Sequence, residues 1–238
     1  VRRRMSSFDI YLDNVSCVRE KLYPVRRPDI VTPKRNYKEY DIPGRDGKYF
    51  EDLGTYDDIT FNINFNFKEK REYLNKTFRD YKRMIRNSKT LMMMDDSEIF
   101  YKIKKVEFGD ISRENTKEIN AFVATFTCDP YGYLFIGQDR YSCEMVQTNP
   151  YALSHPIYII SGEGQCVLTV NGNKMTVNTS GTIYIDTDRC VAYRENGELQ
   201  NVQVSGDFES LYLIEGSNSI TVSDNFKCEV KPNWRCEL

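Results

Sequence analysis

Apolar and polar residues alternate most regularly between residues 59 and 67. Five apolar positions, all Ile or Phe, are separated by one threonine and three asparagines: Ile59, Phe61, Ile63, Phe65 and Phe67. Successive side chains of a strand point to opposite faces of its sheet. This period of two therefore predicts a β-strand with one buried face and one polar face.

A helical period follows immediately. Four apolar residues fall at helical spacing on one face: Leu74, Phe78, Tyr81 and Ile85. Asn66 followed by Glu69 resembles a capping box and predicts that the helix begins near that point. Lysines and arginines cover much of the remaining surface, interrupted by acidic residues. We interpret that surface as a solvated face or a protein contact.

The rest of the first half is predicted to consist of strands and loops. Apolar patterning predicts strands over residues 8–12, 99–108 and 118–128, and the pair Lys104-Lys105 interrupts the alternation in a way that indicates a bulge. Three prolines in residues 24–36 predict an extended or looped path. The segment Asp41–Lys48 contains Pro-Gly and Asp-Gly, which mark turns, and Gly54 is expected to close the next one. We predict that Gly44 and Gly47 adopt conformations that disfavour a Cβ.

The second half has no helical pattern of useful length and many turn signals. Asn171-Gly172 is a strong signal for a two-residue hairpin turn, and Asn196-Gly197 marks a second one. Gly162 and Gly164 are expected to bracket another turn. Roughly eight short strands separated by turns predict a β-sandwich with a jelly-roll or lectin-like layout.

Charge is distributed unevenly along the chain. Residues 1–130 hold 26 Lys and Arg against 22 Asp and Glu, whereas residues 131–238 hold 7 against 13. This shift, with Asp129-Pro130 as punctuation, favours two domains, which we expect to span residues 1–135 and 136–238. The basic residues form no clustered face in the sequence and no long apolar run is present, so we expect neither a nucleic-acid nor a membrane partner. Met5 is expected to be the natural start, with residues 1–4 as an extension.

Candidate chemistry is sparse. The single histidine, His155, precedes a proline and has no oriented base or nucleophile in the sequence around it, so we interpret it as a loop residue. The seven cysteines include no Cys-x-x-Cys pair, which favours reduced thiols over a zinc site. Asp186-Thr187-Asp188 is better explained as a turn than as a calcium loop. We therefore expect no catalytic, metal or cofactor site.

Two other functions stay open from the residues alone. Tyr184, Tyr193 and Tyr212 lie on predicted strands of the second half and are weak candidates for a sugar-binding platform. A carbohydrate-binding module that contacts the host cell wall is therefore the alternative hypothesis. Glu107, Asp110 and Glu114 offer paired carboxylates for a wall-degrading enzyme, but any chain this rich in acids contains such sets.

Several phrases, taken in order, resemble the siphophage distal tail protein family (Dit-like). They begin with Ile42-Pro43-Gly44-Arg45-Asp46-Gly47-Lys48-Tyr49 and Gly54-Thr55-Tyr56. Asp129-Pro130-Tyr131 and Asn149-Pro150 follow, then Gly206-Asp207-Phe208, and finally Pro232-Asn233-Trp234-Arg235. Together they cover nearly the whole chain.

The resemblance implies a mainly β protein with two parts. The first is an N-terminal split β-barrel with one α-helix, the belt domain that forms a homohexameric ring. The second is a C-terminal galectin-like or jelly-roll β-sandwich. The ring would join the tail tube protein to the tail-associated fibre or lysin protein, with the tape measure protein as a further neighbour. The chain would then be a structural component of the virion tail tip or baseplate, made in the bacterial cytoplasm, and not an enzyme.

The resemblance also suggests roles for the motif residues. The loop residues Pro43, Gly44, Arg45, Asp46, Gly47 and Tyr49 are the candidate ring interface. Gly206, Asp207, Phe208, Trp234 and Arg235 are expected to be structural, with Trp234 as a packed anchor. Large carbohydrate-binding insertions occur in some relatives, and this chain is too short to contain one.

Overall fold

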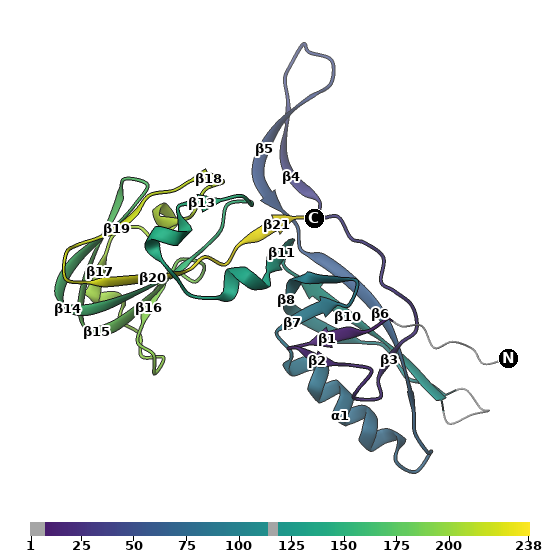
Figure 1. Cartoon of the computed structure of the whole chain (residues 1–238). Coiled ribbons are helices and arrows are strands. Elements are labelled where there is room, and N and C mark those ends of the chain that lie inside the picture. The colour runs from purple at the N-terminus through teal and green to yellow at the C-terminus, as the bar shows by residue number, and fades with distance from the viewer. Residues whose placement is uncertain (1–7, 114–118) are drawn as a thin grey trace. The chain divides into compact units, whose positions relative to one another are not determined.

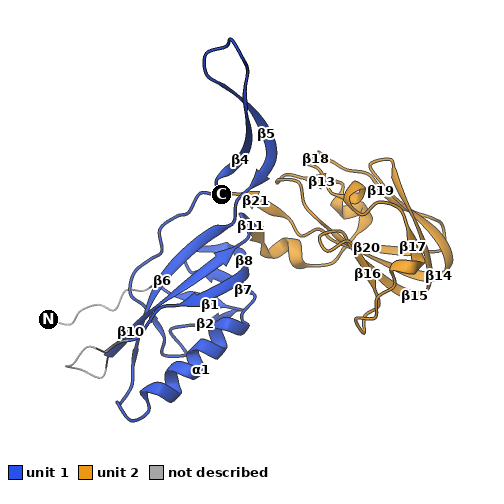
Figure 2. Cartoon of the chain, turned by 180° about the vertical axis from the view of Figure 1, so that it is seen from behind, with its two compact units in different colours: residues 1–132, 238 blue, residues 133–237 orange. Residues whose placement is uncertain are grey.

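The computed structural model describes residues 8–113 and 119–238. The chain folds into two compact units, one of residues 1–132 with Leu238 and the other of residues 133–237 (Figure 2). Residues 1–7 and 114–118 lie outside the described residues, and with them the predictions for Met5, residues 1–4 and Glu114. Over the described part, the predicted mainly β fold with a single α-helix is confirmed.

Unit 1 is built on an open sheet with α1 (Leu74–Asn87) against it (Figure 1). The strand order is β2-β1-β7-β8-β10-β6-β3, and β9 pairs with β10. The bounds are β1 (Ile10–Leu12), β2 (Val15–Ser16), β3 (Tyr23–Pro24), β6 (Ile59–Lys68), β7 (Thr90–Met93), β8 (Asp96–Phe108), β9 (Ser112–Arg113) and β10 (Ile119–Cys128). A separate hairpin of β4 (Arg35–Asp41) and β5 (Lys48–Tyr56) completes the unit.

Strand β6 is the centre of the core of unit 1. Its five apolar residues are each at most 2% exposed, which confirms the predicted buried face. β6 pairs with β10 along its whole length, and Phe65 lies directly opposite Phe122. Phe78 of α1 contacts Phe122 with ring centroids 5.0 Å apart. The apolar faces of helix and sheet therefore meet on aromatic rings.

The predicted start of the helix is wrong. Asn66 lies within β6, where it pairs with Tyr23 and Ala121, so it is not available as a helix cap. Glu69 instead accepts a hydrogen bond from the Thr77 hydroxyl at 3.0 Å. The helix begins at Leu74 without a side-chain cap. The sheet partners of β6 therefore outweigh the local capping signal.

The bulge predicted at Lys104-Lys105 is confirmed. In the pairing of β10 with β8, Thr127 is opposite Lys105 but Cys128 is opposite Ile103, so Lys104 is the extra residue. Its ammonium lies 2.6 Å from both the Asp58 and Asp129 carboxylates. The bulge thus turns a lysine toward two acids, as bulges commonly re-aim a side chain.

Unit 2 is organised by one long hairpin. Strands β14 (Ile157–Val170) and β15 (Asn173–Asp186) pair over all fourteen positions. The connecting residues Asn171 and Gly172 have φ values of 50° and 86°, as a two-residue hairpin turn requires. This confirms the predicted hairpin. The turn predicted at Gly162 and Gly164 is wrong, because both glycines lie inside β14 opposite Gly181 and Thr179.

This hairpin has two halves along its length, the open end and the turn end, and the two pair with different strands. Residues 157–161 pair with β20 (Lys227–Lys231), and residues 184–186 pair with β16 (Val191–Tyr193). Residues 168–170 pair instead with β19 (Ile220–Val222), and residues 176–177 pair with β17 (Val204–Ser205). Apolar residues from both halves meet in one core, among them Tyr158, Ile160, Leu168 and Val170. The predicted galectin-like or jelly-roll layout stays a prediction.

The remaining elements of the chain are short. They are β11 (Tyr131–Leu134), β12 (Tyr141–Ser142), β13 (Thr148–Asn149), β16 (Val191–Tyr193), β17 (Val204–Ser205), β18 (Gly216–Ser217), β19 (Ile220–Val222), β20 (Lys227–Lys231) and β21 (Arg235–Glu237), with the 3-10 turns η1 (Phe135–Gln138), η2 (Cys143–Val146), η3 (Asn201–Gln203) and η4 (Glu209–Leu211).

Candidate functional site

The motif loop of the first half lies at the tip of the β4–β5 hairpin, which projects from the rest of unit 1 (Figure 1). Pro43, Gly44, Arg45, Asp46 and Gly47 form the turn, and Tyr49 is the second residue of β5; all six loop candidates are exposed. Gly44 and Gly47 have φ values of 80° and 77°. Their predicted left-handed conformation, which disfavours a Cβ, is therefore confirmed. Gly54 lies within β5 at φ 65° and does not close a turn.

Both faces of this hairpin carry aromatic rings. Tyr40 lies directly opposite Tyr49, and their ring centroids are 6.2 Å apart on one face. Phe50 lies opposite Glu39 on the other face, which Tyr37 shares. Large apolar side chains between 37% and 55% exposed stand along the hairpin: Tyr37, Tyr40, Ile42, Tyr49, Phe50 and Leu53. Neither face is an ordinary solvated surface, because apolar side chains occupy both.

Polar side chains hold the two strands together. Arg35 and Asp52 form a paired contact, Nη2 to Oδ2 at 2.6 Å and Nε to Oδ1 at 3.0 Å. The Asp52 carboxylate also accepts the Gly54 N–H at 2.9 Å. That backbone hydrogen bond and the Arg35 guanidinium lower the pKa of Asp52. Lys48 and Glu39, and Tyr40 and Glu51, add two further cross-strand contacts. These polar contacts between β4 and β5 therefore stabilise the hairpin, and most of its aromatic side chains stay exposed.

The motif residues Gly206, Asp207 and Phe208 make close contacts within unit 2. A Cβ on Gly206 would lie 3.0 Å from the carbonyl oxygen of Lys174, so the close approach of two backbones requires glycine. The Asp207 carboxylate accepts the Glu209 N–H at 3.1 Å, and Phe208 packs against the core. These contacts give Gly206, Asp207 and Phe208 a structural place.

Trp234 and Arg235 are held by neighbours from several segments. The Trp234 ring lies between Tyr141 and Tyr151, with centroid distances of 5.7 and 5.9 Å. Arg235 is 8% exposed, and its Nε donates to the Leu153 carbonyl at 2.6 Å. The expected packing of Trp234 as an anchor agrees with these contacts.

The three candidate platform tyrosines form two separate stacks. Tyr184 and Tyr193 stack at 5.3 Å with an interplanar angle of 7°, and Arg140 Nη2 donates to the Tyr184 hydroxyl at 3.2 Å. Tyr212 instead stacks on the His155 ring at 4.1 Å. Tyr184 is only 8% exposed. Tyr193, which is half-buried, therefore offers more of the outer surface of its pair than Tyr184 does.

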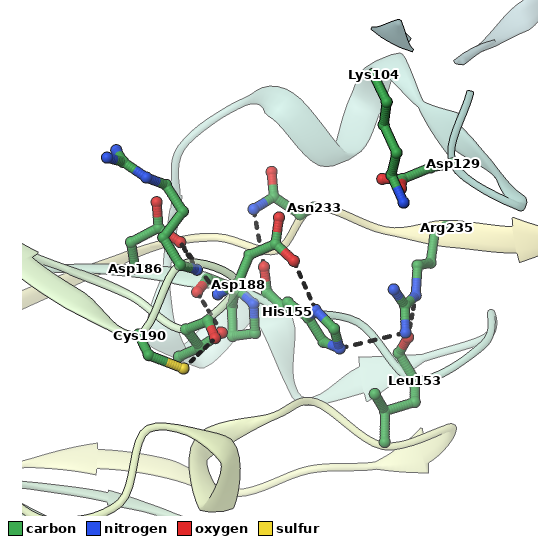
Figure 3. A network of polar contacts seen from close by, with 12 residues as sticks. Lys104, Asp129, Leu153, His155, Asp186, Asp188, Cys190, Asn233 and Arg235 are labelled. Atoms are coloured by element: carbon green, nitrogen blue, oxygen red, sulfur yellow. Dashed lines mark hydrogen bonds and ion pairs between the residues drawn. The ribbon is translucent and has the colours of Figure 1, made fainter. Parts of the chain in front are cut away.

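His155 belongs to a polar network that the sequence did not indicate (Figure 3). Its Nδ1 lies 2.8 Å from the Asp188 carboxylate and its Nε2 lies 3.3 Å from Arg235 Nη2. A guanidinium only donates hydrogen bonds, so Nε2 must accept and Nδ1 must carry the proton. Asn233 donates to the His155 carbonyl at 2.8 Å. Residues far apart in the sequence thus make the histidine a structural link between segments.

The thiol of that region is not prepared for catalysis. Cys190 Sγ lies 3.6 Å from the Thr187 carbonyl (Figure 3). Burial and the nearby acids, Glu209 first, raise the pKa of Cys190. An activated cysteine needs the opposite, a lowered pKa near positive charge. The arrangement around His155 and Cys190 therefore supports folding and not nucleophilic attack.

The part of the chain that the structure describes contains neither a cluster of metal-ligand side chains nor a membrane-spanning helix. There, no three His, Cys, Asp or Glu side chains are grouped to hold a metal ion. No helix of the same residues is long and apolar enough to cross a membrane. Asp186 accepts the N–H groups of Asp188 and Arg189, both at 3.1 Å, which confirms the predicted turn at Asp186-Thr187-Asp188.

Comparison with known proteins gives one kind of match. No family model matches the sequence, and no curated protein matches it. Among solved structures, the chain is similar to the Dit protein (gp 19.1) of phage SPP1, a hub of the adsorption apparatus in phages that infect Gram-positive bacteria. That match has a TM-score of 0.62 and 11% identity, and it covers 98% of this chain and 100% of the SPP1 chain.

A second match is to a chain of the phage P2 baseplate in its activated conformation with Ca. Its TM-score is 0.50 at 9% identity, and it covers 97% of this chain and 98% of that one. Identities this low establish the fold and nothing finer. Both matches run across the two units from end to end. The chain therefore has the distal tail protein fold, the fold that its resemblance to that family predicted.

Proposed function

We propose that this chain is a structural component of a bacteriophage tail tip, a distal tail protein whose copies form a homohexameric ring. The ring joins the tail tube protein to the tail-associated fibre or lysin protein, with the tape measure protein beside it. The fold likeness to the SPP1 hub protein supports a tail role. In this proposal unit 1 forms the belt, and the protein resides in the virion tail tip.

The exposed apolar side chains of the β4–β5 hairpin are the observation that supports ring assembly. An isolated two-stranded hairpin is at best marginally stable in water. Here such a hairpin displays six large apolar side chains at 37–55% exposure. Aromatic residues are enriched at the centres of protein interfaces, and exposed apolar patches mark such interfaces. A neighbouring copy that covers the hairpin would bury these rings, and a repeated head-to-tail contact closes into a ring.

The mass of the chain in solution tests this proposal. The full chain, alone and mixed with its tail tube and fibre or lysin neighbours, is measured by light scattering and by native mass spectrometry. We expect a mass of six copies in at least one of these mixtures. A chain that stays monomeric in all of them contradicts the proposal.

Paired variants then test the contact. The double substitution Tyr49→Ser with Phe50→Ser removes one exposed ring from each face of the hairpin. We expect this variant not to assemble into the six-copy ring, while its unit 2 unfolds at the same temperature as unit 2 of the wild type. The matched control is Met145→Ser with Val202→Ser, which removes two apolar side chains of unit 2 that are 70% and 91% exposed. A ring that survives the hairpin variant, or is lost equally in the control, counts against the hairpin as the contact.

A second candidate function is carbohydrate binding at the host cell wall by unit 2. The stacked Tyr184 and Tyr193, with Arg140 on the Tyr184 hydroxyl, favour it, because sugars pack on aromatic rings beside polar groups. Binding of the full chain to host wall fragments, lost in Tyr193→Ser and kept in Tyr73→Ser, would support it. Tyr73 is a 53% exposed tyrosine of unit 1. No binding above background rejects it.

A further inference from the structure

Two cysteines of unit 2 lie close together, Cys143 directly after β12 and Cys228 within β20. In the pairing of β12 with β20, Tyr141 is opposite Val230 and Ser142 is opposite Glu229. The register of antiparallel strands advances by one residue on each strand. The residues next to the last pair are therefore Cys143, the first residue of η2, and Cys228 in β20.

The two residues are in contact. The Cys143 thiol donates to the Cys228 carbonyl oxygen at 3.3 Å, and the neighbouring Cys143 side chain raises the pKa of the Cys228 thiol. A disulfide needs Cβ atoms about 3.5–4.5 Å apart. Because the Cys143 sulfur already lies within hydrogen-bond distance of the Cys228 backbone, we expect that a small local movement is enough to bond the two sulfurs.

We propose that Cys143 and Cys228 are a dithiol pair that closes to a disulfide on exposure to a low-molecular-weight disulfide such as oxidised glutathione. Thiols stay reduced in a bacterial cytoplasm and oxidise outside it. The biological occasion, release of the virion from the host, rests on the proposed function. The chemistry of the pair does not, because it belongs to unit 2 alone.

The exposure of the two residues sets the order of the steps. Cys228 is half-buried and within reach of an oxidant, whereas Cys143 is 9% exposed. The Cys228 thiolate attacks one sulfur of oxidised glutathione and releases one glutathione thiolate, which leaves a mixed disulfide on Cys228. The Cys143 thiolate then attacks the Cys228 sulfur and releases the second glutathione. One disulfide is reduced, one is formed, and both cysteine protons go to the two glutathione thiolates.

The surroundings of the pair make this reaction slow near neutral pH. The hydrogen bond with Cys143, followed by burial, raises the pKa of the Cys228 thiol well above its ordinary value. Only the thiolate attacks a disulfide, so the rate rises with pH. The pair therefore stays reduced through brief exposure and closes on long exposure.

The disulfide would hold β12, near the start of unit 2, against β20. Strand β12 has two residues, and its pairing with β20 connects it to the large sheet. A disulfide between Cys143 and Cys228 closes most of unit 2 into one loop, and long closed loops restrict the unfolded chain most. We expect the unfolding temperature of unit 2 to rise by about 10 °C.

The test uses the purified, reduced full chain incubated with oxidised glutathione at mildly alkaline pH. Incubation continues until Cys190, the exposed cysteine, carries its glutathione adduct, which shows that the oxidant is active. The chain is then alkylated and cut after glutamates. Cleavage at Glu144 and Glu163 places Cys143 and Cys166 on different peptides. We expect a peptide pair linked through Cys143 and Cys228, and overturning results are no link or a link from Cys166 to Cys228.

The variant Cys143→Ser tests whether Cys143 reacts with Cys228 or only packs against it. In Cys143→Ser, the mixed disulfide on Cys228 has no resolving thiol, so we expect one glutathione to remain on Cys228. In Cys190→Ser, the matched control, the internal disulfide should still form. Two results overturn the proposal. In the first, Cys143→Ser does not accumulate that adduct. In the second, the oxidised wild-type chain unfolds at the same temperature as the reduced wild-type chain. Ring mass is measured separately, so a monomeric chain that forms the disulfide would contradict only the proposed function.

Discussion

Gly162 of β14 lies directly opposite Gly181 of β15, and the Phe226 ring occupies the space where a Cβ of Gly162 would lie. That Cβ would be 2.3 Å from Phe226 Cδ1. The hairpin changes its pairing neighbours on either side of this point, from β20 to β19. The glycine pair thus lets an aromatic ring close over the backbone where the two halves of the hairpin diverge.

Gly162→Ala is therefore expected to destabilise unit 2 by about 2 kcal/mol, because an added methyl group must displace a packed ring. Thermal unfolding followed by near-ultraviolet circular dichroism measures this. Gly109→Ala is the control, since a Cβ there meets Val123 at an ordinary 3.6 Å. Equal stability of the two variants would show that Phe226 yields without cost.

Tyr158 provides a second test of the core of unit 2. Its hydroxyl donates to the Leu211 carbonyl at 2.7 Å and the residue is fully buried. Tyr158→Phe leaves that carbonyl without this donor and should cost about 1–2 kcal/mol in unfolding free energy. Denaturant unfolding measures it, with the exposed Tyr73→Phe as control. An unchanged midpoint would mean that water replaces the hydroxyl.

The same tyrosine predicts alkaline sensitivity. Burial, followed by the neighbouring Cys228 and Cys143, raises the pKa of Tyr158 well above its ordinary value. A raised folded pKa gives a contribution that is fully present below the unfolded pKa of about 10 and is lost as the pH rises from there toward the folded value. The wild-type chain should lose stability in that range more steeply than Tyr158→Phe. Parallel slopes in the two proteins would exclude Tyr158 as the cause.

Asp52 predicts acid sensitivity of the hairpin. The Gly54 N–H and then Arg35 lower its pKa. A lowered folded pKa gives a contribution that is present above the unfolded value of about 3.9 and is lost as the pH falls through the folded value. Carboxyl carbon shifts in an NMR titration should show Asp52 titrating below that value, and Arg35→Gln should raise its midpoint. A midpoint at the ordinary aspartate value in the wild type would contradict the paired geometry.

The hairpin tip gives a prediction of backbone strain alone. Gly44 and Gly47 have positive φ values, and no atom lies within 4 Å of a Cβ at either position. Gly44→Val should therefore destabilise the loop conformation by about 1–2 kcal/mol. The cause is the positive φ of the backbone at this position and not a clash with a neighbouring atom. Gly44→Asn should be milder, because asparagine tolerates the left-handed region. Chemical shifts confined to residues of the hairpin would measure this, and equal effects of the two variants would contradict it.

The sequence predicted those elements whose burial follows a local rule. The alternation in β6 and the apolar stripe of α1 each report one buried face, and that face was where the pattern placed it. The β4–β5 hairpin was missed because both of its faces are exposed. A strand with no buried face has no reason to alternate, so only its turn residues carried a signal.

Glycines misled where a distant residue decides their role. Gly162 and Gly164 resemble turn residues locally, but Gly181 and Phe226, far along the chain, place them inside a strand. His155 similarly looks like a loop residue until Asp188, Tyr212 and Arg235 surround it. No spacing rule joins such residues, because each lies on a different segment.

By itself the sequence determined a mainly β chain with one helix, the Asn171-Gly172 hairpin and the positive φ at Gly44 and Gly47. These follow from side-chain periodicity and backbone sterics, which act over a few residues. Only the tertiary structure decided that the motif loop lies at the tip of a projecting hairpin, that β14 and β15 pair without a break, and that Cys143 contacts Cys228. Those depend on which strands become neighbours, and burial of the whole core selects that pairing.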